Sequence, residues 1–280
     1  MSERKYAVIG HPIGHTMSPF IHRRLFDLAG LKGDYNIIDV PPESLPEMIK
    51  ELDKLDGYNI TIPNKQRIIP YLDRLDEKAE LYGSVNTVRN GNIKEGFTTD
   101  PDGFLEALRS EGIDLCGRVV VLGCGGVARI FLYESVLAGC SVTMAVRRGS
   151  EKKCAALVRD VHEKLGKAEV GICTADSIQG DVDLLINATP LGMFPAADTI
   201  AVSDKVIDRC ANVFDAVYNP LETVLVKKAK ANGAKASGGM SMLVWQAVAA
   251  HRIWDGSEYA GDDIQQLIAD SADEMKRLFR

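Results

Sequence analysis

The sequence has no long uninterrupted hydrophobic segment, which excludes one broad class of protein. Hydrophobic residues make up 46% of the 280 residues, but no run approaches the roughly 20 apolar residues that a membrane-spanning helix needs. The first residues lead almost at once into an apolar strand, without the hydrophobic region of a signal peptide. We therefore expect no membrane partner and a cytoplasmic location.

Cysteine is scarce and scattered. The six cysteines include no Cys-x-x-Cys pair and no Cys/His cluster at the spacing of a metal site. Most of them are expected to be small apolar residues of strands and helices, as a reducing compartment permits. The pattern predicts no metal centre.

An excess of basic residues is also lacking. Lysine and arginine number 33 against 39 aspartates and glutamates, for a formal net charge of −6, and the sequence pI is about 5.5. Nucleic acids and anionic membrane surfaces require a basic footprint, so neither is expected as a partner. A small anionic ligand remains compatible, because it needs only one or two local cationic or hydroxyl groups.

The sequence does contain a repeated alternation of apolar, β-branched runs with segments of helical period. Strands apolar on both faces, separated by helices, are typical of a parallel sheet covered on both sides. The alternation restarts near residue 116, which predicts two α/β domains. A hairpin is expected around Asn90-Gly91, and Ser18, Pro19 and Gly30 predict the N-cap, the first position and the end of a helix. The expected strands cover 5–10, 34–40, 57–63, 118–122, 141–146, 183–189 and 212–219, and the expected helices include 18–30, 43–55 and 101–110.

A glycine turn opens the second half. The segment GCGGVA, from Gly123 to Ala128, fits G-x-G-x-x-G/A directly after the apolar run RVVVL and at the start of a helix. Gly123 suits the tight turn, Gly125 lets a pyrophosphate approach the backbone, and Ala128 keeps the helix close to its strand. With Gly126 and Val127, these residues predict a dinucleotide site at a helix N-terminus. The alternative is an ordinary tight turn between strand and helix.

The next strand indicates which dinucleotide is bound. Where an NAD site usually presents an acidic residue for the ribose hydroxyls, this strand runs into Arg147 and Arg148. Arginine pairs with a 2′-phosphate, so NADP is favoured and NAD is the alternative. The two arginines would otherwise be solvated loop residues.

In the first half, GYNITIPNKQ runs like a buried strand, stops at a proline and presents Lys65 just past the stop. In open α/β sheets, ligands bind beyond the carboxyl ends of the strands. Taken alone, Lys65 would be a solvated loop lysine. Asp100, just before Pro101, would be a helix N-cap whose second carboxylate oxygen stays free.

Taken together, the motifs resemble the shikimate dehydrogenase family, which includes enzymes that use quinate. The resemblance implies reversible NADP-linked oxidation of a ring hydroxyl of shikimate to 3-dehydroshikimate. It implies an N-terminal α/β substrate domain, discontinuous over 1–101 and 238–280, and a Rossmann-type doubly wound domain over 102–237. The motifs, in the family's order, are YAVIGHPIGHTMSPFIH, NITIPNKQ, GSVNTV, GFTTDPDGF, GCGGVA, INATPLGM, YNP and MLVWQA.

Site residues follow from the same resemblance. Lys65 and Asp100 match the catalytic lysine and aspartate, and a lysine beside the reacting oxygen can donate or accept the hydroxyl proton. Ser241 lies where the backbone should pass close to the nicotinamide. The substrate, a hydroxylated cyclohexene or cyclohexane carboxylate, would be bound by Asn86 at the ring hydroxyls with Thr61 in the same pocket, by Thr16 and Ser18 at the carboxylate, by Tyr218 near that end, and by Gln246.

Several departures from the family's pattern bear on the substrate. Thr16 stands where serine is usual, at the end of the ring where quinate carries an added hydroxyl. Thr98 replaces an asparagine, Gly238 replaces an aspartate, and Ser241 replaces a glycine. Three functions therefore stay open: an NADP-dependent shikimate dehydrogenase, a quinate or dual quinate/shikimate dehydrogenase using either nicotinamide, and a dinucleotide-binding regulator without turnover. A monomer or a homodimer is expected.

Overall fold

The computed structural model describes residues 4–14, 16–166 and 168–278. The chain divides into two compact units, Met1–Gly103 with Val244–Arg280, and Phe104–Leu243. We call these the first unit and the second unit. Each carries its own six-stranded sheet, so the expected fold class, α/β with a Rossmann-type second sheet, is confirmed.

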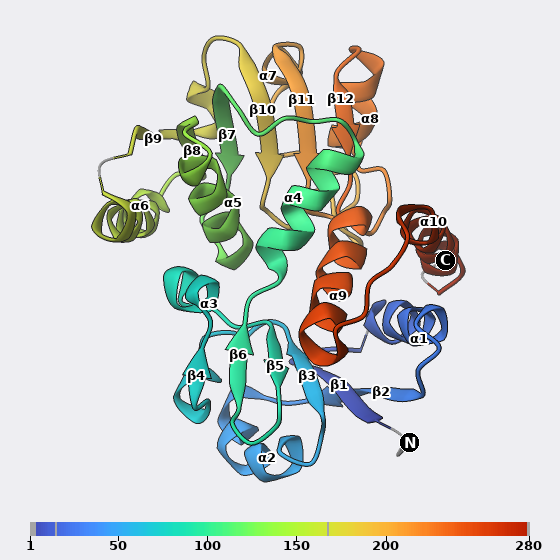
Figure 1. Cartoon of the computed structure of the whole chain (residues 1–280). Coiled ribbons are helices and arrows are strands. Elements are labelled where there is room, and N and C mark those ends of the chain that lie inside the picture. Colours follow the sequence, from blue (N-terminus) through green and yellow to red (C-terminus); the bar gives the residue numbers. More distant parts are fainter. Residues whose placement is uncertain (1–3, 15, 167, 279–280) are drawn as a thin grey trace. The chain divides into compact units, whose positions relative to one another are not determined.

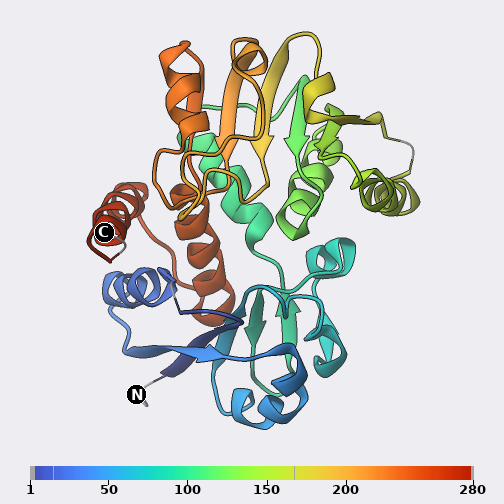
Figure 2. The same cartoon turned by 180° about the vertical axis from the view of Figure 1, so that it is seen from behind.

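The first unit is built on a mixed sheet of order β2-β1-β3-β5-β6-β4 (Figure 1). β1 pairs in parallel with β2 and β3, whereas β5 is antiparallel to both β3 and β6. Helix α1 packs on β2 and on α10 from the other end of the chain, and Figure 2 shows β2 beside β1 from behind. The elements are β1 (Arg4–Gly10), α1 (Ser18–Leu28), β2 (Gly33–Asp39), α2 (Leu45–Leu52), β3 (Gly57–Ile60), β4 (Arg74–Leu75), α3 (Glu77–Tyr82), β5 (Thr87–Arg89), β6 (Glu95–Phe97) and α10 (Gly261–Leu278), with short 3-10 turns at Pro42–Ser44 and Ile69–Tyr71. The boundaries of the units fall within helices α4 (Asp100–Ser110) and α9 (Met240–Asp255), so each of these helices has residues in both units.

The sequence predicted most of this unit, with several corrections. The hairpin at Asn90-Gly91 is confirmed by the pairing of β5 with β6, but its antiparallel strands make the sheet mixed, not wholly parallel. Strand β3 ends at Ile60, three residues before the expected end, because the chain turns there. The Asn64 N–H donates to the Thr61 carbonyl at 3.0 Å, which closes that turn.

The start of α1 also differs from the expectation. Ser18 is the first helical residue and Met17 occupies the N-cap position, so the assignment of Ser18 as N-cap is wrong by one residue. The Ser18 N–H donates instead to Thr16 Oγ1 at 3.2 Å. Thr16 therefore supplies an acceptor for one of the free N–H groups at the helix start.

The second unit is a wholly parallel sheet of order β12-β11-β10-β7-β8-β9. Counted along the chain, this is the strand order of the doubly wound dinucleotide fold, with the switch point between β7 and β10. The central strands are buried on both faces. The elements are β7 (Arg118–Leu122), α5 (Gly126–Leu137), β8 (Ser141–Val146), α6 (Glu151–Leu165), β9 (Val170–Thr174), a 3-10 turn (Ala175–Ser177), β10 (Val182–Asn187), α7 (Asp204–Ile207), β11 (Cys210–Asp215), α8 (Val224–Ala231) and β12 (Lys235–Ser237).

Glycine is required at the turn after β7. Gly123 has φ +101°, and a Cβ there would lie 3.0 Å from the Thr189 Cγ2 and 3.2 Å from the Ala188 carbonyl oxygen. The positive φ and the lack of space for a Cβ both exclude larger residues at position 123. The close approach brings the ends of β7 and β10 together at the switch point.

The core of the first unit contains two buried histidines. His22 stacks on Tyr35 with centroids 4.1 Å apart, and His251 Nε2 lies 3.1 Å from His22 Nδ1. His251 Nδ1 lies 3.6 Å from Asp255 Oδ2, and Arg4 faces the same carboxylate at 4.0 Å. Burial lowers the pKa of both histidines; the His251 charge adds to the effect on His22, and Asp255 opposes the effect on His251.

These shifts predict a loss of stability in acid. A histidine with a folded-state pKa below 6.5 binds its proton more readily when unfolded, so stability is complete above pH 6.5 and falls as pH drops below it. Each histidine contributes up to about 1.4 kcal/mol per pH unit in that range. We expect His22→Gln to flatten the fall in unfolding free energy between pH 7.5 and 5.5, measured by urea denaturation. His162→Gln, which replaces an exposed histidine, is the control and should leave this fall in unfolding free energy unchanged. If the wild type and both variants lost stability equally between pH 7.5 and 5.5, His22 would not be a source of the loss.

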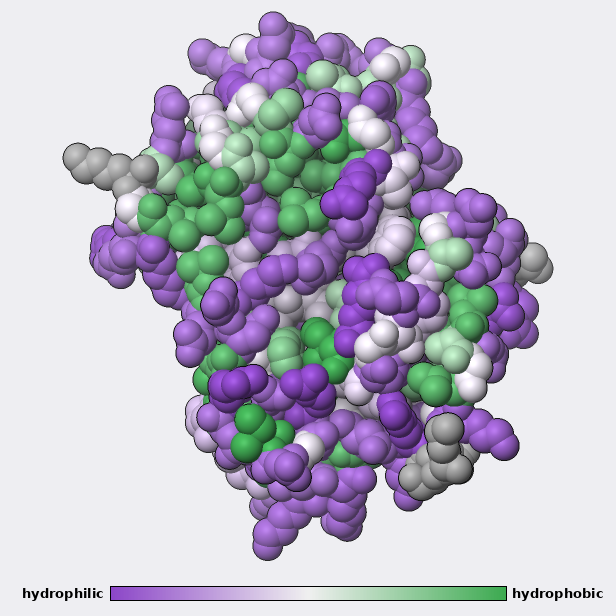
Figure 3. Space-filling model, in the orientation of Figure 1, coloured by the Kyte–Doolittle hydropathy of each residue, from purple (hydrophilic) through white to green (hydrophobic). Residues whose placement is uncertain are grey.

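Much of the face drawn in Figure 3 is hydrophilic, interrupted by patches of hydrophobic side chains. Among the described residues, helices that combine the length and the apolar character needed to cross a membrane were not found.

Candidate active site

Lys65 is held by the turn that follows β3. The Asn64 side chain is fully buried and its Nδ2 donates to the Val40 carbonyl at 2.8 Å. The Lys65 carbonyl accepts from the Val85 N–H at 2.9 Å. Both sides of the turn are therefore tied to neighbouring segments, which fixes where the lysine side chain begins.

Lys65 meets Asp100 as an ion pair. Lys65 Nζ donates to Asp100 Oδ2 at 2.6 Å, with 26% of the lysine side chain exposed and 6% of the aspartate side chain. The other oxygen, Oδ1, accepts from Asn86 Nδ2 at 3.0 Å. Although Asp100 is the first residue of α4, both its oxygens are engaged by side chains, so helix capping alone does not account for it.

Asn86 is the centre of a buried polar cluster. Its Oδ1 accepts from the Thr99 N–H at 2.8 Å and from Thr87 Oγ1 at 3.1 Å. Its Nδ2 lies 3.1 Å from Thr99 Oγ1 and 3.4 Å from Gln246 Oε1. The amide orientation is fixed by these partners, because only Oδ1 can accept from the backbone N–H. The structure thus brings together four of the predicted residues: Lys65, Asn86, Asp100 and Gln246.

Thr61 follows β3, and its N–H donates to the Ile9 carbonyl at 2.8 Å. A Cβ on Gly10 would lie 2.4 Å from Thr61 Cγ2. Glycine at position 10 therefore permits the end of β1 to pass beside Thr61.

The two predicted carboxylate-binding hydroxyls lie together at the start of α1. Thr16 Oγ1 donates to Ser18 Oγ at 3.1 Å, and both residues are partly exposed.

Tyr218 and Ser241 belong to the second unit. Tyr218 follows β11 and is partly buried, which raises the pKa of its phenol. Ser241, in the first turn of α9, is 6% exposed and its Oγ lies 3.4 Å from Ser110 Oγ.

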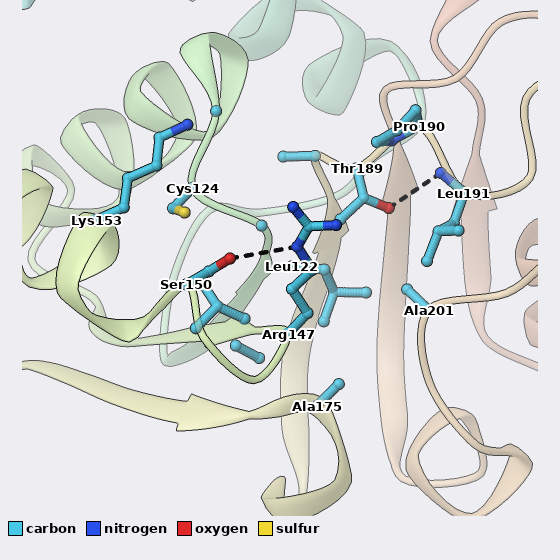
Figure 4. A pocket seen from close by; sticks show the side chains of 15 residues that line it. Leu122, Cys124, Arg147, Ser150, Lys153, Ala175, Thr189, Pro190, Leu191 and Ala201 are labelled. Carbon is cyan, nitrogen blue, oxygen red and sulfur yellow. Dashed lines mark hydrogen bonds between the residues drawn. The ribbon is translucent and has the colours of Figure 1, made fainter.

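A cavity of about 480 Å³ lies in the second unit at the carboxyl ends of β7, β8 and β10 (Figure 4). Arg147 follows β8, and Figure 4 shows its side chain between Ser150 on one side and Thr189 on the other. Arg147 Nε lies 3.4 Å from Ser150 Oγ, and Lys153 reaches the wall from α6. The described lining residues are Leu122, Gly123, Cys124, Gly125, Ala145, Val146, Arg147, Ser150, Lys153, Ala175, Ala188, Thr189, Pro190, Leu191 and Ala201.

The residues that line this cavity agree only in part with the cofactor-binding residues predicted from the sequence. Of the expected cofactor residues, Gly123, Gly125 and Arg147 line the cavity. Sequence reasoning missed Ser150 and Lys153, which are at the start of α6. It also assigned no role to the Thr189 segment, although INATPLGM was noted as a motif. Within the part of the chain that is described, the lining does not include Gly126, Val127, Ala128, Arg148 or Ser241.

A buried carboxylate supports one wall of the cavity. Asp215, at the end of β11, accepts from Asn187 Nδ2 at 2.9 Å and from Thr223 Oγ1 at 2.6 Å. Asn187 Oδ1 in turn accepts from the Thr189 N–H at 3.0 Å. Burial raises the pKa of the Asp215 carboxyl, and these donors oppose the shift. The network holds the Thr189 segment at the switch point.

The cavity fits a dinucleotide. A glycine turn opens the 12-residue helix α5, whose first N–H groups and positive dipole end suit a pyrophosphate. Arg147 and Lys153 add two cations to the lining.

Comparison with known proteins agrees with both units. Residues 8–88 match a family described as the shikimate dehydrogenase substrate binding domain. The chain is 36% identical over 269 residues to a shikimate dehydrogenase (NADP(+)) of Caldanaerobacter subterraneus, covering 94% of this chain and 95% of that protein. It is 40% identical over 260 residues to the Methanocaldococcus jannaschii protein of the same name, and the match covers 90% of this chain and 91% of that protein.

Solved structures extend the comparison to three dimensions. The Thermus thermophilus shikimate 5-dehydrogenase, crystallised in complex with NADP(H) and shikimate, superimposes with a TM-score of 0.84 at 31% identity. The superposition covers 96% of this chain and 99% of that one. The likeness therefore spans both units and not the glycine turn alone.

Proposed function

Because the chain belongs to the shikimate dehydrogenase family, we propose that it interconverts shikimate and 3-dehydroshikimate with NADP. The observation that carries the proposal is the Lys65–Asp100 pair, 2.6 Å apart and joined to the buried Asn86. A family fold alone would not require this pair. A lysine that can exchange a proton, held by a carboxylate and an amide, supplies the proton chemistry that alcohol oxidation needs.

The roles of the first unit follow from that chemistry. Bound NADP would supply the acceptor for the hydride of the ring carbon. Lys65 accepts the hydroxyl proton in this direction and returns it in the other, and its charged form stabilises negative charge on the oxygen. Asp100 orients Lys65. Asn86 holds ring hydroxyls, with Thr61 in the same pocket, Gln246 binds the substrate as well, and Thr16 and Ser18 bind the carboxylate.

The second unit would hold the cofactor. Gly123 and Gly125 suit the pyrophosphate, and Arg147 with Lys153 suits the 2′-phosphate. Tyr218 and Ser241 keep the roles that the family resemblance gives them, near the substrate carboxylate and the nicotinamide.

A dual quinate/shikimate dehydrogenase is the second candidate. Thr16 favours it, because its methyl group alters the carboxylate end, where quinate carries its added hydroxyl. The third candidate, a dinucleotide-binding regulator without turnover, is less favoured, because a protein that only binds would not need the Lys65–Asp100 pair. A cytoplasmic location and a monomeric or homodimeric state remain predictions.

A turnover assay crossing shikimate and quinate with NADP and NAD tests the proposal, with kcat/KM followed by reduced-nicotinamide absorbance. We expect shikimate with NADP to give the highest value of the four pairs. A higher value with quinate would establish the second candidate. No turnover with any pair, in protein shown by titration to bind NADP, would overturn both enzyme assignments.

A further inference from the structure

Two matching turns follow the neighbouring parallel strands β10 and β11 of the second unit. Asn187 ends β10, Asp215 ends β11, and the two residues are paired in the register of the sheet. Asn187 Oδ1 accepts from the Thr189 N–H at 3.0 Å, and Asp215 Oδ1 accepts from the Val217 N–H at 3.0 Å. A side-chain oxygen that accepts from the N–H two residues later forms an Asx turn. Both turns therefore depend on their side chains, at the edge of the sheet where ligands bind in this fold.

A hydrogen bond joins the two turns. Asn187 Nδ2 donates to Asp215 Oδ1 at 2.9 Å, and neither residue is more than 1% exposed. This bond fixes the orientation of the Asn187 amide, because its nitrogen faces the carboxylate and its oxygen faces the Thr189 N–H. The reversed amide would place two acceptors, Asn187 Oδ1 and Asp215 Oδ1, against each other.

The Asp215 carboxylate is held by donors on both of its oxygens. Asn187 and Val217 donate to Oδ1, and Thr223 Oγ1 donates to Oδ2 at 2.6 Å. The Thr223 hydroxyl accepts in turn from the Val226 N–H at 3.3 Å, at the start of α8, so its own proton is directed to the carboxylate. Asp215 is therefore a fixed acceptor for the Asn187 amide.

The first of the two turns forms part of the cofactor cavity. Thr189, Pro190 and Leu191 line it, and Figure 4 shows the Thr189 hydroxyl bonded to the Leu191 N–H. Asn187 contacts both ends of this segment, since Thr189 Oγ1 donates to its Oδ1 at 2.7 Å and its Nδ2 donates to the Leu191 carbonyl at 3.2 Å. The segment also packs against the glycine turn, where a Cβ on Gly123 would lie 3.0 Å from Thr189 Cγ2. That glycine turn suits the pyrophosphate, a group that NADP and NAD share.

We propose that Asp215 is a positioning residue for the dinucleotide: through Asn187 it holds the wall formed by 189–191 against the glycine turn, and so sets the affinity for the part of the cofactor that NADP and NAD share. Asp215 is fully buried and is not among the described residues that line the cavity. The inference rests on the proposed function, because it concerns the same cofactor site. It separates two contributions to binding, since Arg147 and Lys153 distinguish NADP from NAD, whereas Asp215 serves both.

Asp215→Ala is the direct test. It removes the acceptor that orients Asn187, whose amide is then free to turn and release the Thr189 N–H. We expect the dissociation constants of NADP and NAD, measured by calorimetric titration, both to rise about tenfold, as for the loss of a hydrogen bond to a charged group. A rise for NADP alone would contradict the proposal, because the substitution would then act on the 2′-phosphate.

The conservative variant Asp215→Asn should restore both dissociation constants to within about threefold of wild type. Its Oδ1 can still accept from Asn187, and its Nδ2 can donate to the Thr223 hydroxyl. If the alanine variant does not fold, as judged by circular dichroism, Asp215→Ser replaces it, because serine fills part of the space and is too short to reach Asn187. An Asn variant as weak as the Ala or Ser variant would contradict the role of the hydrogen bond.

A double-mutant cycle shows whether Asp215 acts through Asn187. Asn187→Ala removes the link to the wall and leaves Asp215 its bonds to Val217 and Thr223, so it should raise both dissociation constants about tenfold by itself. Adding Asp215→Ala should then change them by less than about twofold, since residues of one network are not additive. Two losses that multiplied would overturn the inference.

Asn212→Ala is the matched control. Asn212 also lies on β11, and its Nδ2 donates to the Asp183 carbonyl of β10 at 2.8 Å, so it joins the same two strands away from their carboxyl ends. Its loss should leave both dissociation constants unchanged. Equal weakening by Asn212→Ala would show that any lost link between β10 and β11 loosens the cavity, and would overturn the specific role of Asp215.

These titrations do not depend on turnover. If the wild-type protein bound NADP but oxidised neither shikimate nor quinate, the proposed function would be wrong, and the dissociation constants would still decide the role of Asp215. If turnover were normal and Asp215→Ala left both dissociation constants unchanged, the inference would be wrong and the proposed function would stand.

Discussion

Replacing Lys65 with alanine is expected to lower kcat for shikimate oxidation by about a thousandfold, within the range that a positioned proton-transfer group supplies. The substitution removes the group that takes the hydroxyl proton, and it leaves the Asp100 carboxylate, 6% exposed, without its cation. Binding of NADP should persist, because the cavity lined by Gly123 and Arg147 belongs to the second unit. The measurements are kcat from steady-state kinetics and the NADP dissociation constant from fluorescence titration.

The structure offers a close control for this substitution. Lys78 Nζ also donates to an aspartate, Asp102 Oδ1, at 2.6 Å, and Asp102 is two residues from Asp100. This second pair is more exposed, at 45% and 38%, and exposed ion pairs contribute little to stability. Lys78→Ala should therefore keep wild-type kcat. If Lys65→Ala did the same, the proposed proton chemistry would be wrong.

The fold class could be predicted from the sequence because the central strands of the second unit are apolar on both faces. The doubly wound order of the second unit follows from the alternation of strands and helices, together with the glycine turn at Gly123. Short elements were missed for a physical reason. The two residues of β4, Arg74–Leu75, are too few to display any periodicity, and their pairing depends on β6 alone.

Site residues could be predicted only where they belong to a recognisable sequence motif. Periodicity alone gives Lys65 as a loop lysine and Asp100 as a helix cap; the family resemblance placed them together, and the 2.6 Å contact agrees with that placement. Tyr35 gave no signal, because a buried tyrosine on a strand is ordinary core packing. Its phenol donates to Asn59 Oδ1, and this contact joins two segments that are distant in sequence.

Lys153 was missed for a related reason. It lies seven residues after the end of β8 at Val146, whereas the sequence interpretation considered only Arg147 and Arg148, which follow that strand directly. The helix α6 begins at Glu151, and its first turn brings Lys153 to the cavity wall, whereas the described wall does not include Arg148. Spacing along a loop does not reveal which of several cations faces inward.

These positions lead to the second prediction of large effect. The double substitution Arg147→Ala with Lys153→Ala should raise KM for NADP by about a hundredfold, because each charge-assisted hydrogen bond to a phosphate contributes about 1.5–3 kcal/mol and exposure reduces the sum. KM for NAD, which lacks the 2′-phosphate, should change by less than about threefold. The measurement is KM for both dinucleotides at fixed shikimate and low ionic strength.

Lys152→Ala is the matched control, since this exposed lysine is adjacent on the same helix and is not among the described lining residues. It should leave both KM values unchanged, which separates a specific contact from the general field of the basic loop. The comparison of the two dinucleotides carries the argument. If KM for NAD rose as much as KM for NADP, the two cations would serve the shared pyrophosphate, and the preference for NADP would have to come from elsewhere in the wall.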